Sequence, residues 1–371
     1  MLGRAWCAAD VSFQILHIGC SPTQGNVQWH GATQGVRWTY LSPFLHPVGG
    51  RALRIVAMAC GLAVLPFALL ANRRKAVVYA YNQGCVVNFF TLLICKMLKI
   101  PVIQECCEWW PGTAGETRLN RWMYSKIMFK WSAAALSISS LIEDRIKEIT
   151  NRDYLQLRIP VLCDCKIGQL PREGGLNHPE RYVFWCGMVD GYRRDPELLI
   201  RAVALVRKSV LIDVVIAGPC SDEVCRDLIA LGKELGLDQH VVRILGFVDD
   251  EALNKWVSDA SALYLPLWND DRSQTRFPTK SALYAASGRP IVTCAIGEIP
   301  EYFADRVTAL FFKPGDPVDL ARGIVELLKN PQLSNQMGKT ALEIVAPRFD
   351  FRMYTRPLSE LCHKVLENNG S

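Results

Sequence analysis

The stretch "YVFWCGMVDGYRRDPELLIRAVALVRK", residues 182–208, decides the fold of the second half of the chain. It opens with five apolar residues, several of them aromatic or β-branched, as in a strand that is buried on both faces. A turn containing Gly187 leads directly into a segment with apolar residues at helical spacing. A buried strand followed by a helix is the repeating unit of a parallel sheet covered by helices.

The same unit recurs along the second half of the chain. Further apolar runs, each typical of a strand, are "IDVVIAG" (212–218), "VVRILG" (241–246), "ALYLPL" (262–267) and "PIVTCAI" (290–296). Helical patterns at 195–208, 221–235 and 249–260 separate these runs, and each begins with an Asp or Ser that can cap the first turn. The sequence therefore predicts a doubly wound α/β domain.

The first half repeats this pattern less regularly. Strand-like runs occupy 13–19, 36–41, 76–81, 101–105 and 134–139. Residues 20–35 are too polar and glycine-rich for a crossover helix, so we expect an incomplete edge to this sheet. Because 371 residues exceed the roughly 250–300 that one core supports, we predict two domains, 1–170 and 171–345, and a final segment, 346–371. The Pro/Gly-rich residues 168–180 are the predicted linker.

The charge of the chain is unevenly divided. The net charge of +6 is the sum of +9 over residues 1–171 and −3 over residues 172–371. A basic first half suits an anionic surface or partner, such as a membrane or a phosphate-bearing acceptor, although a merely solvated basic face fits equally well. We predict no nucleic-acid partner. Fourteen cysteines scattered through apolar runs favour buried thiols in the cytoplasm, and without C-x-x-C we predict no metal site.

Residues 55–71, "IVAMACGLAVLPFALLA", are apolar throughout and are flanked by arginine and lysine residues. Their number is close to the lower limit of about 17–25 residues for a membrane span. The segment also lies where the alternating pattern requires a helix, and it contains Pro66. We favour a buried or membrane-apposed helix and leave a membrane span as the alternative.

One candidate site is the stretch "RFPTKSALYAASGRP", residues 276–290. It follows the strand pattern at 262–267, and we expect its helix to begin at Thr279 and to stop at Gly288. Helix N-termini attract anions, and Arg276 and Lys280 add full positive charges there. Ligands of open α/β sheets bind at the carboxyl ends of the strands, so a diphosphate is the expected occupant.

A second cationic turn strengthens this interpretation. Gly187, Arg193 and Arg194 follow the strand pattern that begins the second domain, again at the carboxyl end of a strand. The alternative is that the two arginines form a surface pair with Asp190 and Asp195. Two cationic turns in one domain favour the phosphate interpretation.

These motifs have a familiar order. The runs "CGMVDGYRRDPELLIRAVALV", "VIAGP", "LGFV", "FPTKSALYAASGRPIV", "GEIPEYF" and "ALFFKPGDPVDLARGIVELLKNP" resemble family-4 glycosyltransferases of the GT-B fold, in the F-P-T-K subgroup. The resemblance implies two facing Rossmann-like domains, the second for a nucleoside-diphosphate sugar and the first for a saccharide or lipid-linked acceptor. It also implies hexose transfer with retention, without metal or other cofactor, and a C-terminal helix (346–371) that crosses back to the first domain.

The resemblance also carries over residue by residue. Arg193 and Lys280 match the family's contacts to the diphosphate, and the predicted donor-binding set is Gly187, Arg193, Arg276, Thr279 and Lys280. The family's paired glutamates fall on Thr275 and Leu283, neither of which is acidic. Because leucine cannot accept hydrogen bonds from a ribose, a non-catalytic nucleotide-sugar-binding or partner subunit is the alternative function.

In the first domain, "PVIQECCEWWPG" (101–112) resembles the family's acceptor loop. Glu105 and Glu108 are then the catalytic candidates, as groups that orient the acceptor hydroxyl, and Trp109 and Trp110 are candidates for stacking on a sugar ring. The alternative is that one glutamate pairs with an arginine and that both tryptophans belong to the core. The predicted location is the cytoplasm, with peripheral contact at the inner face of a membrane.

Overall fold

The computed structural model describes residues 1–9, 11–19, 28–42, 51–70, 76–81, 85–109, 111, 117–150, 153–165 and 181–370. The chain divides into two compact units. Unit 1 comprises Met1–Pro160 and Phe351–Ser371, and unit 2 comprises Val161–Asp350. The chain therefore enters unit 2 after residue 160 and returns to unit 1 at residue 351, whereas the predicted linker at 168–180 lies outside the described residues.

Unit 2 is built on a parallel sheet with the strand order β10-β9-β8-β11-β12-β13. All five strand pairs are parallel. The strands are β8 (Tyr182–Cys186), β9 (Asp213–Ala217), β10 (Val242–Ile244), β11 (Ala262–Leu265), β12 (Ile291–Thr293) and β13 (Leu310–Phe311). Every residue of β8 and β11 is buried, as their continuous apolar pattern predicts. The two-residue strand β13 was not predicted.

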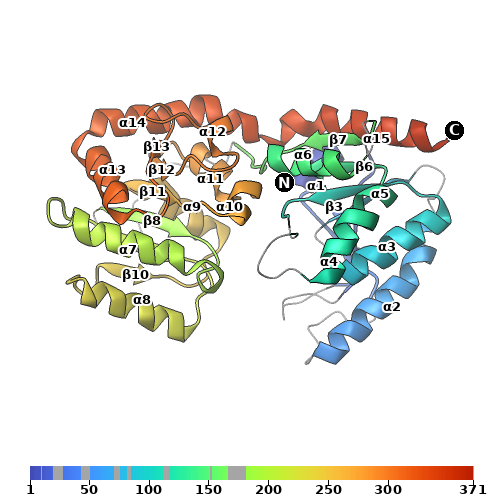
Figure 1. Cartoon of the computed structure of the whole chain (residues 1–371), viewed down its shortest axis with the longest axis horizontal. Coiled ribbons are helices and arrows are strands. Elements are labelled where there is room, and N and C mark those ends of the chain that lie inside the picture. The colour runs from blue at the N-terminus through green and yellow to red at the C-terminus, as the bar shows by residue number, and fades with distance from the viewer. Residues whose placement is uncertain are drawn as a thin grey trace. The chain divides into compact units, whose positions relative to one another are not determined.

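The helices of unit 2 surround this sheet (Figure 1). They are α7 (Arg194–Val206), α8 (Asp222–Glu234), α9 (Asp250–Asp259), α10 (Asp271–Thr275), α11 (Lys280–Ala286), α12 (Ile299–Tyr302), α13 (Pro317–Lys329) and α14 (Pro331–Thr340). Ser221 caps α8 and Asp249 caps α9 through their side chains, as predicted. The expected cap of α7 is wrong: this helix begins at Arg194 without a side-chain cap, and Asp195 is buried in its first turn.

Unit 1 contains two separate sheets. A four-stranded parallel sheet has the order β4-β5-β6-β7, formed by Val78–Ala80, Val102–Cys106, Ala134–Ser137 and Leu155–Arg158. A three-stranded sheet has the order β1-β3-β2, formed by Gln14–His17, Val36–Tyr40 and His30–Thr33. Here β1 and β3 are parallel, while β2 and β3 form a hairpin through Gln34 and Gly35, both with positive φ. The polar residues before β3 thus supply an unpredicted strand, β2, rather than a crossover helix.

The helices of unit 1 are α1 (Leu2–Ala8), α2 (Arg51–Leu70), α3 (Cys85–Leu98), α4 (Arg118–Trp122), the π-helix η2 (Met123–Met128), α5 (Phe129–Trp131), α6 (Ser140–Ile149) and α15 (Thr355–Gly370). One apolar core joins residues of α2 and α3 to β4 and β5. A second core lies between α6, η2 and β6. The predicted helix at 55–71 is thus confirmed as α2, which packs beside α3 (Figure 1).

Candidate functional site

The two predicted cationic turns lie on either side of the point where the strand order of unit 2 reverses. From β8 the chain adds β9 and β10 on one side, and it then returns to place β11 on the other side of β8. The loops after β8 and β11 leave the sheet in opposite directions, which opens a crevice at its carboxyl edge. Residues 187–193 follow β8, and residues 266–279 follow β11, so both turns border this crevice.

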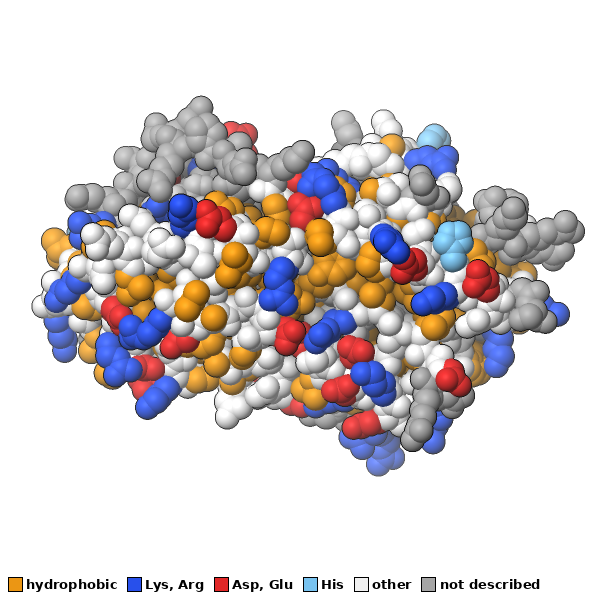
Figure 2. Space-filling view, turned by 90° about the horizontal axis from the view of Figure 1, so that it is seen from above, with side chains coloured by type: hydrophobic (Ala, Val, Ile, Leu, Met, Phe, Trp, Pro, Cys, Tyr) orange, Lys and Arg blue, Asp and Glu red, His pale blue; other side chains and the backbone are white. Residues whose placement is uncertain are grey.

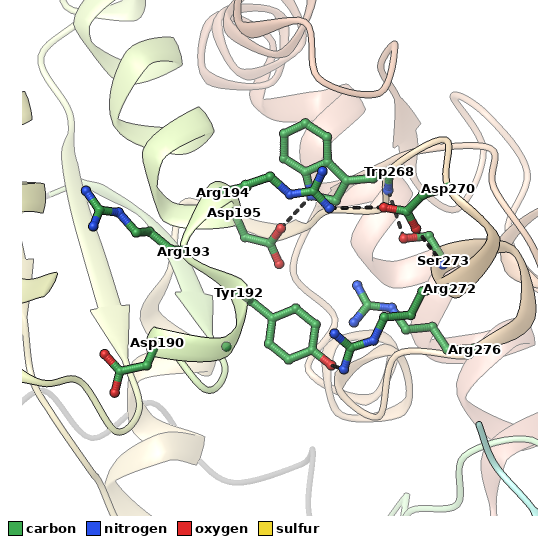
Figure 3. A pocket seen from close by; sticks show the side chains of 11 residues that line it. Asp190, Tyr192, Arg193, Arg194, Asp195, Trp268, Asp270, Arg272, Ser273 and Arg276 are labelled. Atoms are coloured by element: carbon green, nitrogen blue, oxygen red, sulfur yellow. Dashed lines mark hydrogen bonds and ion pairs between the residues drawn. The ribbon is translucent and has the colours of Figure 1, made fainter. Parts of the chain in front are cut away.

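The first cavity at this edge encloses about 220 Å³ between the loop after β8 and the segment that contains α10 (Figure 3). Four arginines from the two segments line it: Arg193, Arg194, Arg272 and Arg276. Three aspartates, Asp190, Asp195 and Asp270, also line it. The cavity is therefore strongly charged, and the pairing of each arginine decides which of them is available to an anion.

Arg194 is held by the wall of the cavity. Its guanidinium pairs with Asp270 at 3.0 Å and lies 4.4 Å from the centre of the Trp268 ring. The Trp268 Nε1–H donates to Asp195 at 2.7 Å. Burial raises the pKa of Asp195 to about 6, while the Trp268 hydrogen bond and the charges of Arg276 and Arg194 oppose this rise. Arg194 thus links the first turn of α7 to Trp268 and Asp270 in the wall of the cavity.

Arg193 and Arg276 differ in their partners. Arg193 pairs with Glu197 at 2.7 Å and with Asp227 at 2.9 Å, and Figure 3 shows its side chain pointing away from the other arginines. Arg272 donates to the Tyr192 hydroxyl at 2.8 Å. The Arg276 guanidinium lies 4.6 Å from the centre of the same ring.

Arg276 makes no ion pair with a carboxylate among the described residues, although its charge acts on Asp195, and its Nε is buried without a hydrogen bond. A buried donor that lacks a partner costs about 1–3 kcal/mol, so its retention calls for an explanation. An anion in the cavity would supply the missing acceptor. Arg276 is therefore the arginine of this cavity that is best placed to bind a phosphate.

The second cavity encloses about 290 Å³ at the same edge of the sheet. It contains three of the predicted donor-binding residues, Gly187, Thr279 and Lys280. The rest of its lining is largely apolar and includes Phe247, whose side chain is 81% exposed. The structure thus divides the predicted set: Arg193 and Arg276 line the first cavity, and the other three line the second.

Gly187 and Gly218 each have a structural reason to lack a side chain. A Cβ on Gly187 would lie 2.8 Å from the Trp185 ring. The Gly187 backbone lies against Gly218, which follows β9 and has a φ of +137°. A Cβ on Gly218 would lie 1.7 Å from the Gly187 carbonyl oxygen. The two glycines let the loops after β8 and β9 touch, and together they form part of the wall of the second cavity.

The predicted helix start is only partly confirmed. The helix α11 begins at Lys280 rather than Thr279 and has seven residues, and Thr279 makes no side-chain capping bond. Its dipole adds less than a long helix would, so the charges of Arg276 and Lys280 matter more. Thr275 and Leu283 occupy the positions of the family's paired glutamates. Thr275 is buried, and its hydroxyl donates to the Asp271 carbonyl within α10. Leu283 is partly exposed and lines neither cavity.

Several residues that line the two cavities were not predicted from the sequence, and five of them have side chains or backbones that shape the walls. These five are Tyr192, Gly218, Phe247, Trp268 and Arg272. Their common signal is position, because each lies in the segment that follows β8, β9, β10 or β11. "VIAGP" and "LGFV" contain two of them, and the rule that ligands bind at the carboxyl ends of strands could have found them.

Unit 1 places Glu105 near the carboxyl end of β5, beside the rings of Tyr79 and Tyr81. Burial raises the pKa of Glu105 to about 7, and the nearby Tyr79 hydroxyl partly opposes the rise. A carboxyl group that titrates near neutrality has the pKa expected of a general acid or base.

We expect this carboxyl group to make stability depend on pH. Because its pKa is raised on folding, the folded state is disfavoured as the pH rises from about 4.5 through about 7. The loss from this one group should approach about 3 kcal/mol at pH 8. Denaturant midpoints of the wild type and Glu105→Gln, each at pH 5 and pH 8, measure it. The variant should lose less stability over this interval, and equal losses would contradict the assignment.

The remaining predicted residues of unit 1 belong partly to its core. The Glu108 carbonyl accepts a hydrogen bond from Tyr124 Oη at 3.2 Å. The Trp109 ring stacks on Phe129 with centroids 6.3 Å apart and lies 5.6 Å from the Arg145 guanidinium. These contacts favour the core interpretation of Trp109, and Trp110 lies outside the described residues. In the part of the chain that the structure describes, no three His, Cys, Asp or Glu side chains form a group able to hold a metal.

Unit 2 is similar in sequence to known proteins. Residues 180–330 match the family model for glycosyl transferases group 1. The D-inositol 3-phosphate glycosyltransferase of Streptomyces avermitilis is 30% identical over 154 residues, which cover 39% of this chain and 32% of that protein. An uncharacterized glycosyltransferase of Methanocaldococcus jannaschii is 27% identical over 195 residues, covering 52% of this chain and 47% of that protein. The chain thus matches about a third to a half of the length of these relatives.

Solved structures extend the similarity to both units. Sucrose-phosphate synthase from Thermosynechococcus elongatus superposes with a TM-score of 0.77 at 17% identity, covering 99% of this chain and 92% of that chain. Anabaena HepE in complex with UDP superposes with a TM-score of 0.68 at 14% identity, covering 89% and 86%. These similarities confirm the predicted fold class, an α/β fold of the GT-B type with two Rossmann-like units.

Proposed function

We propose that the protein is a retaining, metal-independent glycosyltransferase that moves a hexose from a nucleoside-diphosphate sugar to a saccharide or lipid-linked acceptor. The observation that carries this proposal is Arg276, at the point where the strand order of the unit 2 sheet reverses. It makes no ion pair among the described residues, its Nε is buried without a hydrogen bond, and its charge acts on the neighbouring Asp195. The match of residues 180–330 to glycosyl transferases group 1 supports the reaction class. The UDP bound to HepE supports the donor class.

The two cavities suggest how a donor would be divided between them. Arg276 and Lys280 would contact the diphosphate and neutralise the negative charge that develops on it as the sugar leaves. The apolar second cavity, with the exposed Phe247 ring, suits a nucleoside because aromatic rings stack on bases. Gly187 and Thr279 would form the wall next to the nucleoside. Arg193 is the weakest member of this set because its guanidinium already has two carboxylate partners.

The acceptor side of the proposal rests on unit 1. Glu105 would orient the acceptor hydroxyl, and its raised pKa would let it hold or release a proton near neutral pH. Glu108 follows it at the same end of β5 and is the second candidate. Both roles rest on the resemblance of this loop to the family's acceptor loop and on the burial of Glu105.

Replacing Lys280 tests the diphosphate assignment. Lys280→Ala should weaken the binding of UDP or another matching nucleotide by about 2 kcal/mol, the value of a charge-assisted hydrogen bond. Its thermal stability should stay close to that of the wild type, because Lys280 has no ion pair with another described residue. Isothermal titration calorimetry and a melting curve measure the two effects. Unchanged affinity would show that the phosphates bind elsewhere.

The alternative function, a non-catalytic nucleotide-sugar-binding or partner subunit, is favoured by Leu283. This leucine occupies the position of an acidic ribose contact in the resembling family, and it lines neither cavity. Following the fate of a radiolabelled donor, with and without a chelator, separates the two functions. Donor hydrolysis or transfer that persists in the chelator supports the metal-independent enzyme. Donor binding without any turnover supports the subunit.

A further inference from the structure

From Ile55 to Leu70 helix α2 is apolar on all sides, yet unit 1 covers only one stripe of it. Over Ala52–Leu70 the mean hydropathy is 2.2, and 22% of the residues are buried. The buried positions are Ala57, Gly61, Leu65 and Leu69, which recur every fourth residue and therefore form one narrow stripe. A helix that is apolar all round is normally buried in a core or in lipid. The rest of the α2 surface therefore calls for a partner.

The neighbouring helices continue this exposed apolar surface. In α3, Val86, Phe90 and Met97 form an outward stripe at helical spacing, and α3 packs beside α2. In α4, the Trp122 ring is 46% exposed and lies 6.3 Å from the Phe89 ring of α3. We call the following set the α2–α3 surface: Leu53, Ile55, Val56, Val64, Phe67 and Leu70 of α2, Val86, Phe90 and Met97 of α3, and Trp122 of α4.

The charge around this surface has one sign. The sequence contains no Asp or Glu between Asp10 and Glu105, a stretch that includes all of α2 and α3. Arg54 is exposed on α2, and Arg118, Lys126 and Lys130 are exposed on α4, η2 and α5. The face of the molecule in Figure 2 differs, because Lys/Arg and Asp/Glu side chains are interspersed across it. The described helices α2, α3, α4, η2 and α5 thus carry exposed cations and no acidic residue, and such a surface complements an anionic lipid surface.

We propose that the α2–α3 surface rests on an anionic lipid bilayer, with α2 lying in the interfacial plane. Exposed Phe67, Phe90 and Trp122 would enter the acyl boundary, while the cations would meet the head groups. Helix α2 does not span the bilayer, because Leu65 and Leu69 belong to the core that α2 shares with β4 and α3. This inference does not depend on the proposed transferase activity.

Flotation with lipid vesicles tests this proposal without donor or acceptor. The wild type should float with vesicles that contain phosphatidylglycerol and should bind phosphatidylcholine vesicles at least about tenfold less. The variant Phe67→Asp/Met97→Asp should lose about tenfold or more of its binding to the anionic vesicles. Both side chains are 74% exposed, so the folded state should tolerate the change. Circular dichroism checks that it does.

Matched variants in unit 2 control for general effects. Leu211→Asp/Val318→Asp replaces apolar side chains that are 73% and 65% exposed, and it should float like the wild type. Lys126→Glu/Lys130→Glu should remove the preference for anionic lipid, whereas Lys208→Glu/Lys313→Glu, also at exposed positions, should keep it.

Four results would overturn the proposal. The first is a wild type that does not float with anionic vesicles at low salt. The second is an equal loss in the unit 2 control variants. The third is retention in the membrane after alkaline extraction, which would make α2 a span. The fourth is a wild type that forms a dimer and does not bind vesicles, together with a Phe67→Asp/Met97→Asp variant that is monomeric. The partner of the α2–α3 surface would then be a second copy of the chain.

Discussion

Replacing Arg276 with alanine should weaken the binding of the nucleotide donor about 100-fold, close to 3 kcal/mol. A guanidinium presents several donors in one plane to a phosphate, and Arg276 makes no ion pair among the described residues that a phosphate would have to replace. The melting temperature should fall only slightly. The variant gives up one cation–π contact with Tyr192 and the favourable charge that acts on Asp195, but it also removes a positive charge beside Arg272. Calorimetric titration with UDP measures the affinity.

Arg193→Ala is the matched control for Arg276→Ala. It removes the same charge from the same cavity, but Glu197 and Asp227 already hold its guanidinium at 2.7 and 2.9 Å. We expect a loss in affinity of less than about 1 kcal/mol, typical of exposed ion pairs. If Arg193→Ala weakens binding more than Arg276→Ala does, the phosphates lie on the other side of the loop after β8.

Replacing Gly218 with alanine should destabilise unit 2 by at least about 4 kcal/mol. The new Cβ would lie 1.7 Å from the Gly187 carbonyl oxygen, and the backbone φ of +137° disfavours any side chain. Neither neighbour can move easily, because Gly218 N–H donates to the Gly246 carbonyl and Gly187 N–H donates to the Ala217 carbonyl. Chemical denaturation followed by circular dichroism measures the loss.

Gly236→Ala provides the comparison for this prediction. Gly236 also has a positive φ, +78°, but a Cβ at this position would have no atom within 4 Å among the described residues. Backbone strain alone should cost about 1–2 kcal/mol. Equal losses for the two variants would show that the Gly187 backbone makes room for the added Cβ, so that only the positive φ of Gly218 opposes a side chain there.

The sequence predicted most of unit 2 because its strands are buried on both faces and therefore read as continuous apolar runs. Five of its six strands match these runs, while β13, with two residues, is too short to give a pattern. In unit 1, β2 and β7 escaped prediction. Among the described strands, β2 pairs with β3 alone and stays mostly exposed, and its residues are polar or small, so no apolar alternation marks it.

The site was predictable in its location but not in its pairings. The cationic turns after β8 and β11 were visible as charges next to strand ends. The pair of Arg193 with Glu197 is local, but the other partners lie far away in the sequence: Asp227 of α8 pairs with Arg193, and Asp270 before α10 pairs with Arg194. No local pattern contains these distant contacts. Tyr192 and Trp268 were missed for the same reason, since their roles come from the arginines that lie against their rings.

The most direct test of the proposed donor site is a calorimetric panel of UDP-, GDP-, ADP- and dTDP-sugars titrated into the wild type and into Arg276→Ala. We predict that at least one of these donors binds the wild type, and that the variant binds the same donor about 100-fold more weakly. If no donor binds the folded wild type, or if Arg276→Ala binds as tightly as the wild type, the crevice between β8 and β11 is not a nucleotide-sugar site.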